Sequence, residues 1–130
     1  MIRVAAFALA VALAVPLALA QGSGAKKAHH GGQVVVAKGE HDHFLELVAK
    51  DGELTLYVRD DEDNADSVKG AKGSATVLAG GKQTTVRLEP QEPNILKGKG
   101  SFTVAKGMKV VVTLTLPEHR PITARFTPAD

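Results

Sequence analysis

Two apolar runs that alternate with polar residues on either side of Asp51-Gly52 constrain the fold most strongly. Asp and Gly tolerate the positive φ values of a two-residue type I′ turn, so Lys50 and Glu53 are expected to pair across it. The register that follows sets three apolar pairs on one face: Ala49 with Leu54, Leu47 with Leu56, and Leu45 with Val58. A slip of one residue would set Leu47 against a polar position, because side chains alternate between faces. This stretch therefore predicts an antiparallel hairpin with one buried face.

After the leader, the rest of the chain also consists of short apolar segments separated by turn residues, as in an all-β protein, and it shows no helical periodicity. Short segments rich in Val and Thr are expected as strands over residues 33–36, 43–49, 54–59, 74–79, 82–89, 102–105, 109–116 and 122–126. Gly80-Gly81 predicts a second two-residue hairpin. Seven or eight short strands in about 100 residues predict a small immunoglobulin-like antiparallel β-sandwich, with a small barrel as the alternative.

The first twenty residues are typical of a cleaved signal peptide. Arg3 carries the positive charge, residues 4–19 are apolar, and Ala18-Leu19-Ala20 is a small-x-small cleavage signal. A transmembrane anchor is the alternative, but the apolar stretch contains Pro16 and is shorter than the ~18 to 20 residues a spanning helix needs. We therefore expect a signal peptide over 1–20, a flexible His/Gly/Lys arm over 21–32 and one sandwich domain over 33–130. The product is expected to be periplasmic or secreted, with no membrane insertion after cleavage.

Composition narrows the function classes. The chain has 16 Lys and Arg, one of them in the leader, against 14 Asp and Glu, which argues against a nucleic-acid partner. There is no cysteine, so disulfides and thiolate ligands are excluded. Only Met108 follows the leader, which disfavours a copper(I) site. The nucleophile motif Gly-x-Ser-x-Gly is missing, and we expect no enzymatic activity.

The polar ends of the Asp51-Gly52 hairpin carry the candidate metal ligands. Extending the register sets His43 opposite Asp60 and His41 opposite Glu62, and opposed residues have Cβ atoms ~5 Å apart. Imidazole with carboxylate suits zinc, copper(II) or nickel. Neutral histidine binds metal and protonated histidine does not, so such a site would release its ion below about pH 6. The alternative is a His–Asp pair at a solvated hairpin end.

The remaining histidines and the acidic run carry weaker signals. His30 would join the site only if the arm folds back, and a mobile basic tail is the alternative. His119 lies between two prolines and is expected as an exposed turn residue. Residues 60–66 lack the glycine and the distal glutamate of an EF-hand, so a solvated connection is expected.

Three stretches resemble a known group of proteins: HHGG at 29–32, GEHDHFLELV at 39–48 and DGELTLYVRDDED at 51–63. The group comprises small exported bacterial β-domains that occur alone or attached to periplasmic adaptor subunits of heavy-metal efflux systems, of the cobalt–zinc–cadmium and copper type. The resemblance implies handling of divalent metals, with His30, His41 and His43 as the transferable candidates. The chain departs from the group after Asp60, where the loop is more acidic.

These observations together predict an exported divalent heavy-metal-binding protein, a carrier or buffer associated with metal efflux. His41 and His43 are the expected main ligands, helped by Asp60, Glu62 and His30. A periplasmic adaptor of a metal efflux pump is the expected partner. The alternative is a structural or protein-docking β-sandwich in which the histidines are incidental.

Overall fold

The structure is a computed structural model that describes residues 27–39 and 41–129. The predicted signal peptide and residues 21–26 of the predicted arm lie outside the described residues. Within the described part of the chain, no helix has the length and apolar character needed to cross a membrane.

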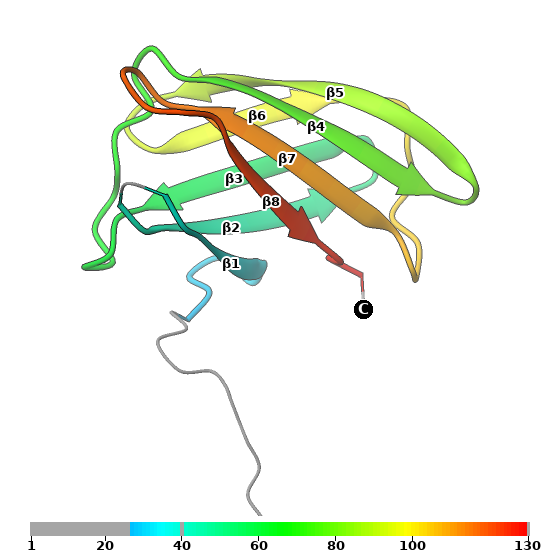
Figure 1. Cartoon of the computed structure of the whole chain (residues 1–130). Helices are drawn as coiled ribbons and strands as arrows, with labels where there is room; N and C mark the ends of the chain where they lie inside the picture. Colours follow the sequence, from blue (N-terminus) through cyan, green and yellow to red (C-terminus); the bar gives the residue numbers. More distant parts are fainter. Residues whose placement is uncertain (1–26, 40, 130) are drawn as a thin grey trace, which may run out of the picture.

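The described residues form eight antiparallel strands and no helix (Figure 1). In chain order the strands are β1 (Gln33–Ala37), β2 (His43–Lys50), β3 (Glu53–Arg59), β4 (Lys72–Ala79), β5 (Lys82–Gln91), β6 (Ile95–Lys99), β7 (Lys109–Thr115) and β8 (Ile122–Phe126). They pair in the order β1-β2-β3-β6-β5-β4-β7-β8, as one sheet that curls until its two ends approach each other. The prediction of an all-β domain with seven or eight antiparallel strands is confirmed.

The β2–β3 hairpin has the predicted register. Lys50 pairs with Glu53, and the three apolar pairs follow as expected from the Asp51-Gly52 turn. Gly52 has a φ of 74°, which glycine adopts without the steric cost of a side chain. Asp51 does not have a positive φ, so the turn type predicted from the sequence, type I′, is wrong although the register is correct. Leu45, Leu47, Leu54, Leu56 and Val58 are all fully buried. Each such side chain contributes about 1.5–3 kcal/mol through removal of apolar surface from water.

The strand predicted over residues 102–105 is wrong, and a strand that the sequence did not indicate takes its place. Residues 102–105 form a loop that lies against the β2–β3 turn, where the N–H of Gly52 donates to the carbonyl of Phe102. The sixth strand is β6, which pairs with both β3 and β5. Its sequence ILKGK contains Gly98, where an added Cβ would collide with the carbonyl oxygen of Arg87. In the sequence alone this glycine indicates a turn. In the structure it lies inside a strand, where glycine is required because the neighbouring strand approaches closely.

The two halves of the sheet face each other as layers in Figure 1, with β1, β2 and β3 below and β4 and β7 above, while β8 descends from the upper strands to the level of the lower ones. β5 links them, since it pairs with β4 along most of its length and with β6 at its end. The core between the layers includes Leu56, Leu96, Val112 and Phe126. An immunoglobulin fold places its second and third strands in different sheets, whereas β2 and β3 form a hairpin, so that finer topology is not confirmed.

The edges of the sheet, β1 and β8, come together without a backbone ladder among the described strands. A side chain joins the two edges: the N–H of Thr127 donates to Oε1 of Gln33 over 2.7 Å. The other end of this seam, where β1 ends and β8 begins, lies beside His41, His43 and His119.

Candidate functional site

The acidic segment after β3 ends the hairpin before the predicted His–carboxylate pairs can form. The β2–β3 ladder stops at Phe44 and Arg59. Asp60 then turns its carboxylate onto its own loop, where Oδ1 accepts the N–H groups of Glu62 and Asn64, each over 2.9 Å. Aspartate side chains commonly compete with strand pairing in this way. The ladder therefore contains neither a His43–Asp60 pair nor a His41–Glu62 pair.

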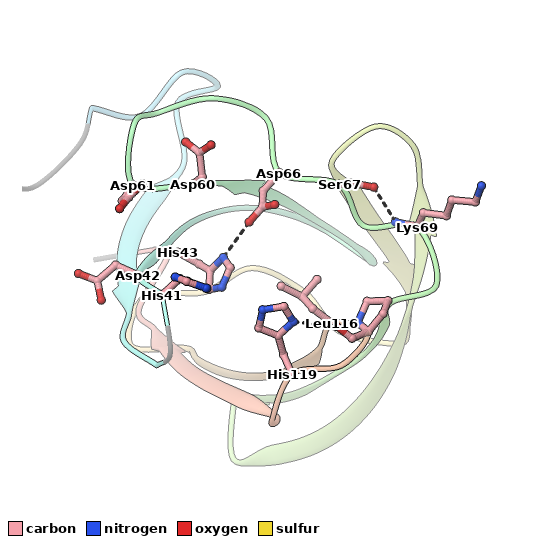
Figure 2. Close-up of a pocket in the computed structure, with 11 residues that line it drawn as sticks. His41, Asp42, His43, Asp60, Asp61, Asp66, Ser67, Lys69, Leu116 and His119 are labelled. Atoms are coloured by element: carbon pink, nitrogen blue, oxygen red, sulfur yellow. Dashed lines mark hydrogen bonds and ion pairs between the residues drawn. The ribbon is translucent and has the colours of Figure 1, made fainter.

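The loop returns to β3 and brings a different carboxylate to His43. The N–H of Asp66 donates to the carbonyl of Val58 over 3.1 Å, which places Asp66 above the start of β2. Its Oδ2 lies 2.8 Å from Nδ1 of His43 (Figure 2). His43 is only 5% exposed, because it lies on the same inward face of β2 as Leu45. An ionised carboxylate only accepts, so Nδ1 of His43 donates this hydrogen bond, and in the neutral ring the lone pair is on Nε2.

Two further histidines gather beside His43. The ring centroid of His119, in the loop between β7 and β8, lies 6.1 Å from that of His43 and 6.1 Å from that of His41. Nδ1 of His119 lies 2.7 Å from the carbonyl oxygen of Pro117. That carbonyl can only accept, so the lone pair of His119 is likewise on Nε2. The three imidazoles come from two segments, since His119 is 76 residues after His43 and 78 after His41 in the chain.

The pocket around these histidines is acidic. It is lined by four aspartates against a single lysine, together with the three histidines and apolar or hydroxyl groups: Asp42, Asp60, Asp61, Asp66, Lys69, His41, His43, His119, Ser67, Leu116 and Pro117 (Figure 2). The same three histidines line a second depression on their other side, with Lys38 and Arg120. The imidazoles thus form the wall between the two depressions. An excess of carboxylates on the first side favours a cationic ligand there.

The described residues contain no group of three or more His, Cys, Asp or Glu side chains already arranged to hold a metal ion. His43 is held in place, whereas His41 is exposed and His119 is half-buried. The three imidazoles are therefore neighbours that do not form a complete ligand set as they stand.

The outer face of the β2–β3 hairpin holds the other two histidines in a different way. Glu46 is fully buried, and its carboxylate accepts the backbone N–H groups of His29, His30 and Gly32 over 2.9, 2.7 and 2.9 Å. A Cβ at Gly32 would collide with the carbonyl oxygen of Leu47. The described end of the predicted arm is therefore fastened to the sheet, and the HHGG motif has a structural explanation.

The side chains of His29 and His30 complete this fastening. The His30 ring stacks on Tyr57 with centroids 3.6 Å apart and planes 3° from parallel. Nε2 of His29 lies 3.0 Å from Oδ2 of Asp63, whose Oδ1 lies 3.0 Å from Nη1 of Arg59. His30 is thus bound to the outer face, since Glu46 and Tyr57 point away from the side of β2 that carries His43.

Of the five residues predicted as ligands, His41, His43 and Asp60 line the acidic pocket. Glu62 and His30 do not line it. Two residues that sequence reasoning did not choose do: Asp66, which lies in the acidic run already noted, and His119, whose only local signal was its place between prolines. Neither could be chosen by local pairing, because each reaches the pocket through a loop.

Comparison of the chain with protein-family models, with curated proteins and with solved structures found no match.

Proposed function

We propose that this protein binds a divalent transition metal ion, as an exported carrier or buffer associated with metal efflux. The proposed site is the acidic pocket at the start of β2, with His41 and His43 as main ligands and Asp60 as a neighbouring carboxylate. One observation carries the proposal: Nδ1 of the buried His43 is bound to the Asp66 carboxylate within a pocket rich in carboxylates. Metal-ligating histidines almost always donate their other ring N–H to a carboxylate, carbonyl or water.

The donor chemistry sets the class of ion. Imidazole nitrogens with carboxylates nearby suit zinc, copper(II) or nickel, whereas a copper(I) site would use the thiolate and thioether ligands that this pocket lacks. His30 and Glu62 are left out of the proposed ligand set, because neither lines the pocket.

The cellular context of the proposal comes from the sequence. Residues 1–20 are proposed as a signal peptide that directs the chain to the periplasm or outside the cell, and a periplasmic adaptor of a metal efflux pump is the proposed partner. The facing layers in Figure 1 support the description of the fold as a small sandwich.

Calorimetric titration with zinc or copper(II) tests the proposal. The His41→Ala/His43→Ala double variant should lose most of the affinity of the parent protein. The matched control is His29→Ala/His30→Ala, which also removes two imidazoles but takes them from the outer face of the hairpin. It should bind the ion like the parent. Equal affinity of the first double variant and the parent would refute the site, and no binding by the parent would favour a docking protein.

A further inference from the structure

His119 lies near one edge of the sheet, whereas His41 and His43 lie near the opposite edge. His43 begins β2, next to the edge strand β1, and His41 lies just before it. His119 belongs to the loop that joins β7 to the opposite edge strand β8. Because the sheet curls, the ring of His119 nevertheless lies close to those of His41 and His43, with a centroid separation of 6.1 Å in each case.

The seam beside these histidines lacks the hydrogen bonds that join the other neighbouring strands. No backbone ladder links β1 to β8 among the described residues, and the N–H of Thr127 reaches across to the side chain of Gln33 instead. Unpaired strand edges are the least secured part of a sheet. A ligand that binds both sides of the seam would therefore hold two segments that the backbone leaves unlinked.

Two of the three imidazoles are oriented by groups that only accept hydrogen bonds. The carboxylate of Asp66 accepts a hydrogen bond from Nδ1 of His43, and the carbonyl of Pro117 accepts one from Nδ1 of His119. Both rings therefore offer Nε2 to a ligand, and both have the outer partner that fixes the tautomer of a metal-bound histidine. The Pro117 carbonyl therefore orients the His119 ring in the same way as the Asp66 carboxylate orients the His43 ring.

The geometry points to His119 as a third nitrogen ligand of the ion that His41 and His43 bind, and to the bound ion as a staple across the β1–β8 seam. This inference rests on the proposed function and deepens it. The site is not preformed, so the exposed His41 ring and the loop that carries His119 move toward His43 to assemble it, while Nδ1 of His119 keeps its bond to the Pro117 carbonyl. Three imidazoles leave a fourth position of a tetrahedral ion open, as in an exchangeable rather than a closed structural site.

A staple of this kind has a thermodynamic consequence. An ion that bridges segments far apart in the chain binds the folded protein and not the unfolded one, so it raises the melting temperature by mass action. The rise should depend on His119, because without it the ion is held by ligands from one side of the seam only.

The test uses purified protein with zinc or copper(II) as the probe, and compares the parent, His119→Ala and the neighbouring control Arg120→Ala. Pulsed electron paramagnetic resonance of the copper(II) form should count three bound imidazoles in the parent and in Arg120→Ala, and two in His119→Ala. The zinc affinity of His119→Ala should fall at least about tenfold, since loss of an outer partner alone costs 10–100-fold. Its zinc-dependent rise in melting temperature should be smaller than that of the control.

The outcomes separate this inference from the proposed function. A count of two imidazoles in the parent would overturn the role of His119, and this readout needs no variant to fold. The role would also be overturned if His119→Ala kept the parent's affinity while His41→Ala/His43→Ala lost it, and in both cases the proposed function would stand. A parent protein that binds neither ion would overturn both.

Discussion

Nδ1 of His43 lies 2.8 Å from Oδ2 of Asp66, a residue 23 positions further along the chain. The pairing depends on the loop between them, which leaves β3 at Arg59 and returns at the bridge between Arg59 and Ala65. This loop decides which carboxylate of the acidic run meets the buried imidazole.

Asp66→Asn should weaken zinc binding by about 10–100-fold, because an amide orients the His43 ring less strongly and does not increase its basicity as a carboxylate does. Calorimetry measures the change. The control is Asp61→Asn, which removes the same charge from the same pocket without touching His43. Equal losses in the two variants would mean that Asp66 acts only through the electrostatic field of the pocket.

Glu46→Gln should lower the free energy of unfolding by about 3 kcal/mol, because it removes a buried charge that faces three backbone donors and the Arg59 guanidinium. Urea denaturation followed by circular dichroism gives the value. Glu89→Gln, at an exposed pair with Arg87, should cost no more than about 1 kcal/mol. Similar stability of the two variants would contradict the role assigned to Glu46.

His30→Ala should lower the stability by about 0.5–1.5 kcal/mol through loss of the stack on Tyr57, and it should leave the zinc affinity unchanged. The two quantities are measured by denaturation and by calorimetry on the same preparation. A drop in zinc affinity would show that the fastened segment contributes to the metal pocket.

Gly98→Ala should destabilise the fold by about 1–3 kcal/mol or more, because the added methyl group collides with the carbonyl oxygen of Arg87 and lies 2.6 Å from Cγ1 of Val86. Thermal unfolding detects the loss. Gly39→Ala is the matched control, since its Cβ would meet nothing closer than 3.8 Å. An unchanged melting temperature for Gly98→Ala would contradict the close approach of β5 and β6.

The parts of the fold that could be predicted are those that neighbouring residues decide. The Asp51-Gly52 turn and the alternation around it are enough to set the β2–β3 register, because a two-residue turn leaves one alignment that buries all three apolar pairs. The Gly80-Gly81 turn likewise sets the register of β4 and β5, in which Ala79 pairs with Lys82. β6 was not predicted, because its glycine, Gly98, reads as a turn signal unless its contact with β5 is known. β6 pairs with β5 only after an intervening turn that contains Pro93.

The sequence by itself determined an all-β chain, the register of its central hairpin and the gathering of histidines with acidic residues at one end of that hairpin. Only the tertiary structure decided that Asp66 rather than Asp60 meets His43, that His119 joins from the far end of the sheet, and that His30 is held on the outer face. The physical reason is range. Turn geometry and side-chain alternation act between residues a few positions apart, whereas the path of a loop and the closure of a sheet depend on packing between distant segments.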